Sequence, residues 1–274
     1  MRILIAGGSG YVGRGIIERY CLTNDFINIS LSRHADLAVN NALVDLSLPI
    51  SFLSFDQPID MIINCVECRA TDNSNGDNKR AYLAAVRHLV EYAQDRDIKK
   101  FIHFSVNHLN TVENDYQQAR FVAEGLVKSG GFDYIVFKPT VIFGENSPLE
   151  YLMNSLLSRS ILLKFWKEDA RIAPVHLLDV IANVGYAIEH NDCWNETYAL
   201  CGPETMSFEE MLFRRRMIKR PKLLSAPSGL AMRSALKNMP VPSNYLRLLL
   251  DWVNADDRRV YARSLVEPRF SYKP

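Results

Sequence analysis

The chain has 274 residues, of which 48% are hydrophobic and 23% are charged. This composition is typical of a globular protein, and the length suffices for one extended α/β domain or two small ones. The formal net charge of +1 argues against a general attraction to nucleic acid or to a membrane surface. No apolar stretch reaches the length of a membrane span, and because an apolar strand and glycines open the sequence, we expect no signal peptide. We therefore expect a cytoplasmic protein whose five cysteines are free thiols.

The chain opens with MRILIAGGSGYVG, in which an apolar run at 3–6 enters a loop with three regularly spaced glycines. Such a loop between a strand and a helix is typical of dinucleotide binding. Gly7 permits the tight turn, Gly10 lets the backbone approach a pyrophosphate, and Gly13 lets the next helix pack closely. The phosphates are expected on the N–H groups that begin the helix predicted at 11–22. The alternative, a glycine-rich surface turn, is disfavoured by the strand before it and the helix after it.

Apolar strands alternate with amphipathic helices through the first half of the chain. Further strands are predicted at 26–31, 42–44, 59–66, 99–105 and 132–137. Helices are predicted at 78–94 and at 115–129, where Gly130 and Gly131 form a left-handed stop, and a polar loop is predicted at 72–78. This order predicts a Rossmann-type α/β fold, a doubly wound parallel sheet buried on both faces. Ligand sites in such sheets lie beyond the carboxyl ends of the strands.

The pattern loosens after Gly144, which suggests a second part of the chain. A helix at 148–158, a strand at 197–201, a helix at 208–219 and helical segments from 222 onward are predicted. We expect residues 1–145 to form the dinucleotide-binding domain, to which a strand and helix return from about 172–200. Residues 146–274 are expected to form a smaller, mainly helical substrate lobe within one compact unit.

The residue that follows the second strand distinguishes NAD from NADP. An acidic side chain there would bind the ribose 2′-hydroxyl and repel a 2′-phosphate. The strand ends instead in Leu31, Ser32 and Arg33, about twenty residues past the glycines, without a carboxylate. Arg33 can place two N–H groups on a phosphate and Ser32 can add a hydroxyl. This favours NADP over NAD, the alternative being a solvated surface arginine.

Several later segments carry motifs of one known family. They are AGGSGYVG at 6–13, VDL at 44–46, INCV at 63–66, KKFIHFS at 99–105, FKPTVIFG at 137–144, PVHLLDV at 174–180 and YALCGPETMSFEEM at 198–211. Together they resemble the extended and atypical short-chain dehydrogenases/reductases, the superfamily of the NAD-dependent epimerases and dehydratases. The nearest branch is the atypical one that includes the NADPH-carrying accessory subunit of respiratory complex I.

The resemblance implies a set of cofactor contacts. Asp45 would contact adenine, the strand end at 63–66 would lie against the adenosine, and the loop at 137–144 would pack on the nicotinamide ribose. The expected cofactor-binding residues are Gly7, Ser9, Gly10, Tyr11, Val12, Gly13, Ser32, Arg33, Asp45, Leu46, Asn64, Cys65, Val66, Ser105, Tyr116, Arg120, Lys138, Pro139 and Val141.

The family's catalytic pair is a tyrosine with a lysine four residues later, and here the pair is Tyr116 and Arg120. The resemblance implies Tyr116 as general acid/base, Arg120 as ribose anchor, and Ser105 or Asn107 as a donor to the substrate. Arginine keeps the positive charge but cannot deprotonate, so it cannot relay a proton. Val106 stands where the second of the family's paired serines, usually the catalytic one, is found.

Because of these departures, two functions stay open. The first is an NADP(H)-dependent oxidoreductase or epimerase/dehydratase acting on a hydroxy or keto compound, such as a nucleotide sugar. The second is a non-catalytic NADP(H)-binding protein with a structural, assembly or redox-sensing role. The partner is a small molecule rather than nucleic acid or a membrane, and a homodimer is left open.

Other polar residues have simpler interpretations. Cys65 and Cys68 form a CxxC pair that could be a redox dithiol, but ordinary thiols are favoured and no metal site is expected.

His103 alternates with apolar neighbours and is interpreted as a hydrogen-bonded core or surface histidine. His176 and Asp179 are expected to order the loop that leads into the helix beginning near Asp179. The buried stripe of the helix at 115–129 is assigned to Ala119, Val122, Ala123 and Leu126.

Overall fold

The computed structural model describes residues 1–30, 39–50, 53–55, 58–67, 75–107, 115–214, 221–225 and 263–272. The chain divides into two compact units. The first unit comprises Met1–Pro139, Val180–Leu200 and Arg263–Val266, and the second comprises Thr140–Asp179, Cys201–Ala262 and Glu267–Pro274. None of the helices in the described ranges is long and apolar enough to cross a membrane.

The first unit is built on a sheet of seven strands that all run parallel. The strands are β1 (Arg2–Ala6), β2 (Asp25–Ser30), β3 (Asn40–Leu43), β4 (Met61–Asn64), β5 (Lys100–Phe104), β6 (Asp133–Pro139) and β10 (Glu196–Leu200). Their spatial order is β10-β6-β5-β4-β1-β2-β3. This topology confirms the predicted Rossmann-type sheet, and β1 lies where the strand order reverses.

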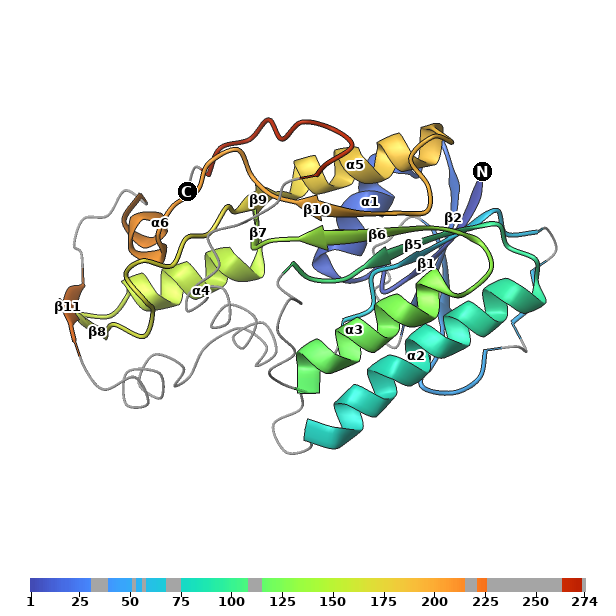
Figure 1. The fold of residues 1–274 in the computed structure, drawn as a ribbon, viewed down its shortest axis with the longest axis horizontal. Helices are drawn as coiled ribbons and strands as arrows, with labels where there is room; N and C mark the ends of the chain where they lie inside the picture. The colour runs from blue at the N-terminus through green and yellow to red at the C-terminus, as the bar shows by residue number, and fades with distance from the viewer. Residues whose placement is uncertain are drawn as a thin grey trace. The chain divides into compact units, whose positions relative to one another are not determined.

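Helices cover both faces of this sheet (Figure 1). They are α1 (Tyr11–Tyr20) and α5 (Leu177–Glu189) on one side, and α2 (Asn75–Asp95) and α3 (Asp115–Lys128) on the other. Burial on both faces explains why the central strands read as continuous apolar runs. Helices α1 and α5 pack closely: Tyr20 donates its hydroxyl to Ile181 O (3.2 Å), and a Cβ at Gly185 would lie 1.9 Å from the Tyr20 oxygen.

A segment from the end of the chain covers the edge of the sheet at β10. The Arg263 N–H donates to Ala199 O (3.1 Å), and the Arg263 guanidinium bonds the Glu196 carboxylate (2.9 Å). The buried Asn183 side chain accepts from Leu265 N (2.7 Å) and Val266 N (3.2 Å). The exposed strand edge is thereby protected from pairing with other chains.

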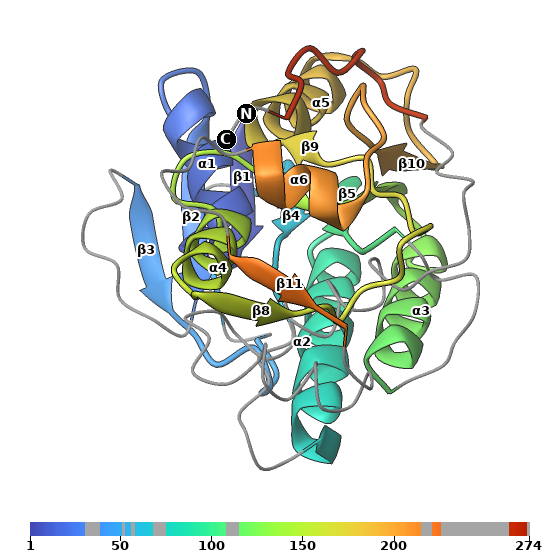
Figure 2. The same cartoon turned by 90° about the vertical axis from the view of Figure 1, so that its left-hand side faces the viewer.

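Within the residues that the structure describes, the second unit contains two helices and two small parallel strand pairs. Its elements are α4 (Pro148–Leu157), α6 (Phe208–Arg214), β7 (Ile142–Phe143) paired with β9 (Val175–His176), and β8 (Ile161–Leu163) paired with β11 (Lys222–Leu224). Figure 2 shows β8 and β11 side by side. Phe165, Trp166 and Phe208 form an aromatic cluster within it, with ring centroids 5.0–5.5 Å apart.

Several sequence predictions need correction. Helix α2 begins at Asn75, so 75–78 is helical rather than part of the predicted polar loop, and 72–74 lies outside the described residues. Residues 222–224 form a strand rather than a helical segment, because they pair with β8. Val122 is 42% exposed, since the inward stripe of α3 is made by Ala119, Ala123 and Val127. The left-handed stop is confirmed at Gly131, whose φ is +81°.

Candidate functional site

The glycine turn after β1 is held by its own backbone. Gly7 has a φ of +78°, which favours glycine, and its N–H donates to Ile29 O (3.0 Å). The Gly10 N–H donates back to Gly7 O (3.0 Å). A Cβ at Gly13 would lie 2.5 Å from Gly7 O and 2.7 Å from Gly8 Cα. Gly13 is therefore required for the close packing of α1 on the turn.

The start of α1 has an exposed N-cap, followed by backbone N–H groups that precede the helical hydrogen bonds. Gly10 is the N-cap, with φ −77° and ψ 170°, and it is exposed. The helical ladder begins with the Arg14 N–H, which donates to Gly10 O (2.8 Å), so the N–H groups of Val12 and Gly13 precede it. Ser9 and Tyr11 stand on either side of Gly10 and are half-buried. A helix start of this kind attracts anions such as phosphates.

The turn adjoins the end of β4, at the switch point of the sheet. The Cys65 N–H donates to Ala6 O (2.8 Å), and a Cβ at Gly7 would lie 2.9 Å from Cys65 O. In open parallel sheets, ligands bind in the crevice at this point. Cys65 and Val66 are half-buried beside the turn, and burial raises the pKa of the Cys65 thiol. The structure thus brings the predicted glycines together with the predicted strand end.

Two of the predicted residues lie inside the protein rather than on a surface. The Asn64 amide nitrogen lies 3.0 Å from His103 Nδ1, and the Asn64 amide oxygen accepts from the Val66 N–H (3.0 Å). Both side chains are 0% exposed. Burial, helped by the positive charges of Arg120 and Lys138, lowers the pKa of His103 to about 3. Nε2 of the neutral ring makes no hydrogen bond to any described residue. The histidine predicted to be hydrogen-bonded in the core is therefore bonded through only one of its two ring nitrogens.

In the segment at 44–46 that was expected to contact adenine, Asp45 is exposed and hydrogen-bonded within the chain. Its carboxylate accepts from the Ser47 hydroxyl (2.6 Å) and the Ser47 N–H (2.9 Å), and these bonds lower its pKa. Leu46 is buried, and its carbonyl lies 3.0 Å from His88 Nδ1. Ser32 and Arg33, on which the choice of NADP depends, lie outside the described residues.

Arg120 of α3 is 2% exposed and enclosed by protein groups. It donates to Phe104 O (3.1 Å), forms an ion pair with Glu67, and stacks on Tyr82, with Cζ 4.8 Å from the ring centroid. The predicted ribose anchor thus joins α3 to α2 and to the ends of β4 and β5. Glu67 and Tyr82 were not singled out in the sequence, where only their proximity to the strand end and to α2 could have drawn attention.

The predicted serine is also engaged within the protein. The Ser105 hydroxyl donates to Glu124 (2.7 Å), and the same carboxylate bonds Lys138 (2.9 Å). Ser105 is 3% exposed and Glu124 is 5% exposed. Glu124 was missed, although its spacing of four residues from Arg120 places both on one helix face. Val106 is buried as well.

The remaining predicted residues fall in separate places. The Asn107 N–H donates to Pro139 O (3.3 Å). Tyr116 is the second residue of α3, and the structure describes its backbone only. Val141 belongs to the second unit, where its carbonyl accepts from the Val175 N–H (2.9 Å).

His176 and Asp179 organise the second unit. The Asp179 carboxylate accepts from the N–H groups of Arg269 (2.9 Å) and Phe270 (3.2 Å). His176 accepts from the Leu178 N–H (3.1 Å), and its pKa is lowered by burial, which the Asp179 charge opposes. These contacts order the start of α5 and a segment near the C-terminus.

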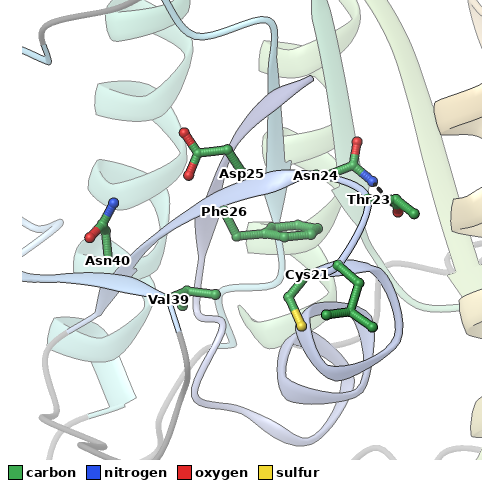
Figure 3. Close-up of a pocket in the computed structure, with 8 residues that line it drawn as sticks. Cys21, Thr23, Asn24, Asp25, Phe26, Val39 and Asn40 are labelled. Atoms are coloured by element: carbon green, nitrogen blue, oxygen red, sulfur yellow. Dashed lines mark hydrogen bonds between the residues drawn. The ribbon is translucent and has the colours of Figure 1, made fainter.

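A hollow in the first unit lies away from the glycine turn (Figure 3). It is lined by the residues that follow α1 and by the first residues of β2 and β3, among them Asp25 and Asn40. Those are the amino ends of parallel strands, whereas the turn follows the carboxyl end of β1. Within the described ranges, no three His, Cys, Asp or Glu side chains gather as a metal site, and Cys68 lies outside them.

Comparison with known proteins identifies the family. The model of the NAD dependent epimerase/dehydratase family matches residues 3–193, which is more than half of the chain. The chain belongs to this family. The UDP-glucose 4-epimerase of Vibrio cholerae is 23% identical over 243 residues, which cover 77% of this chain and 73% of that protein.

Solved structures share the fold of this chain. The UDP-glucose 4-epimerase of Thermotoga maritima, solved with UDP-glucose, matches with a TM-score of 0.66 at 14% identity and covers 84% of this chain and 87% of its own. The Bordetella bronchiseptica enzyme WbmH, solved with NAD+, matches with a TM-score of 0.67 at 13% identity and covers 82% and 85%. The resemblance seen in the sequence is therefore confirmed at the level of the family and of its fold.

Proposed function

We propose that this protein binds a nicotinamide dinucleotide over the glycine turn and the carboxyl ends of β1 and β4. The observation that carries the proposal is the exposed start of α1, with Gly10 as its cap and the Val12 and Gly13 N–H groups ahead of the helical ladder. Membership of an NAD-dependent family supports it. Calorimetric titration with NADPH and NADH tests it.

For the choice of dinucleotide, we propose NADP(H). Ser32 and Arg33 follow the second strand without a carboxylate, which favours a 2′-phosphate over a free hydroxyl. WbmH, a relative in fold, binds NAD, so NAD is the competing assignment. Arg33→Asp should weaken NADPH binding by roughly tenfold or more, through loss of one charge-assisted contact. Unchanged NADPH affinity in this variant would favour NAD.

For the reaction, we propose redox chemistry at a hydroxy or keto carbon of a small substrate in the cytoplasm. A nucleotide sugar is the favoured class, because the Vibrio cholerae relative is a UDP-glucose 4-epimerase. The bound dinucleotide supplies the hydride chemistry. Tyr116 would exchange a proton with the substrate oxygen, and the Arg120 charge would support its ionised form. Tyr116→Phe should then lower turnover by roughly a hundredfold while dinucleotide affinity is retained.

A second function, dinucleotide binding without turnover, is favoured by two specific contacts. Arg120 donates to Phe104 O, pairs with Glu67 and stacks on the Tyr82 ring. The Ser105 hydroxyl donates to Glu124. Such a protein would act as a structural subunit, an assembly factor or a redox sensor, as the resemblance to the complex I accessory branch suggests. It would bind NADPH but turn over no substrate in a screen of nucleotide sugars and carbonyl compounds.

A further inference from the structure

A buried amide lies in the middle of β2, where its neighbours are apolar. Asn28 is 1% exposed and stands between Ile27 and Ile29 in the burial pattern of the strand. An amide at such a position is costly unless both its ends are hydrogen-bonded. The hydrogen bonds of the Asn28 amide therefore indicate which segments of the fold it holds in place.

The two ends of the Asn28 amide join three segments. Its oxygen accepts from the Gly8 N–H (3.0 Å), and its nitrogen donates to the Asn41 side-chain oxygen (2.8 Å). Asn41 is the register partner of Asn28 on β3, and its own amide donates to Val39 O (2.8 Å). A Cβ at Gly8 would lie 2.6 Å from the Asn28 oxygen, so the contact depends on a glycine there.

This bond completes the internal hydrogen bonding of the turn. The N–H groups of Gly7, Gly8 and Gly10 donate to Ile29 O, to Asn28 and to Gly7 O, respectively. These bonds hold the turn from within the protein, directly ahead of Gly10, the exposed N-cap of α1. At the other end, Asn41 lies on the strand that leads into the segment 44–46, where adenine is expected.

We propose that Asn28 is a positioning residue for the ADP half of the dinucleotide, an inference that rests on the proposed dinucleotide binding. Its side chain sets the spacing between the pyrophosphate turn and the adenosine segment. It acts through Gly8 and Asn41 and does not touch the ligand. The consequence is specific: loss of Asn28 weakens every ligand that contains ADP, by the same factor.

Calorimetric titration of three variants with ADP and with NADPH tests this role. Asn28→Leu keeps the branching and the number of side-chain heavy atoms but leaves the Gly8 N–H without its acceptor, and we expect about tenfold weaker binding of both ligands. Asn41→Ala changes an exposed residue of β3 and should weaken both by about threefold, because the Asn28 amide loses the partner that orients it. Asn40→Ala, on the opposite face of the same strand, is the matched control and should bind as the wild type does.

The outcomes separate the two proposals. If the wild type binds neither ADP nor NADPH, the proposed function itself fails. If the wild type binds and the folded Asn28→Leu variant binds both ligands equally well, the positioning role is wrong. If Asn28→Leu does not fold, the Asn41→Ala variant tests the positioning role. Unchanged affinities of Asn41→Ala for ADP and NADPH, or a loss of affinity limited to NADPH, would then overturn it. Parallel losses for ADP and NADPH, with Asn40→Ala unaffected, support it.

Discussion

Gly10→Ala separates ligand binding from folding. The Gly10 backbone, at φ −77° and ψ 170°, is one that alanine adopts without strain. The nearest heavy atom to the new Cβ would be Gly7 O at 3.2 Å, which requires a shift of a few tenths of an ångström. Replacing glycine at a helix N-cap by alanine costs about 1 kcal/mol or less. In a chain of this size, that corresponds to a fall in Tm of about 2–4 °C.

The effect on the bound state should be much larger. The methyl group would stand at the exposed cap of α1, where a pyrophosphate has to approach the Val12 and Gly13 N–H groups. Loss of one hydrogen bond to a charged group costs about 1.5–3 kcal/mol. The Kd for NADPH should therefore rise by roughly ten- to a hundredfold.

Calorimetric titration and thermal unfolding on the same samples measure both quantities. Gly125→Ala on α3 is the control, because its Cβ would meet no atom within 4 Å, and its Kd should equal that of the wild type. A Gly10→Ala protein that binds NADPH within twofold of the wild type would refute a pyrophosphate seated on this turn.

Three further outcomes follow from the same contacts. Gly125→Ala should raise stability by about 0.5–1 kcal/mol, because it removes a glycine from the middle of a helix; a lowered Tm would contradict this. Arg120→Lys should cost about 1–3 kcal/mol in denaturant unfolding, since one ammonium cannot serve Phe104 O, Glu67 and Tyr82 together, and NADPH affinity should change less than threefold. An unchanged midpoint would show that this network contributes nothing. The pKa of buried His103 is about 3, whereas that of a histidine in the unfolded chain is about 6.5. Because protonation then favours the unfolded chain, the contribution of His103 to the free energy of unfolding is complete above pH 6.5 and is lost as the pH falls toward 3. Between neutral pH and pH 5, the free energy of unfolding of the wild type should fall by about 2 kcal/mol more than that of His103→Gln. Denaturant unfolding at a series of pH values measures this, and parallel pH profiles of the two proteins would contradict it.

The sheet and the glycine turn could be predicted because short-range patterns determine them. The apolar run at 3–6 and the spacing of Gly7, Gly10 and Gly13 specify a strand, a turn and a helix within 20 residues. The pairs β7 with β9 and β8 with β11 could not, because strands of two or three residues carry no periodicity and form only through distant partners.

The candidate site was predictable in position but not in detail. The sequence predicts Arg120 on the helix at 115–129 and implies a role as ribose anchor, and the structure buries its side chain on α3. That Glu67 and Tyr82 enclose it depends on segments 38–53 residues away, which no local pattern reveals. Asn28 was predicted only as part of a strand, because a single polar residue in an apolar run does not reveal its hydrogen-bond partners.

We propose that the glycine turn after β1 binds a nicotinamide dinucleotide. Calorimetric titration of the purified wild-type protein with NADPH and with NADH tests it most directly. Saturable one-to-one binding, with a lower Kd for NADPH than for NADH, is the predicted result. Absence of binding to both nucleotides, in a sample whose thermal unfolding shows that it is folded, would contradict it.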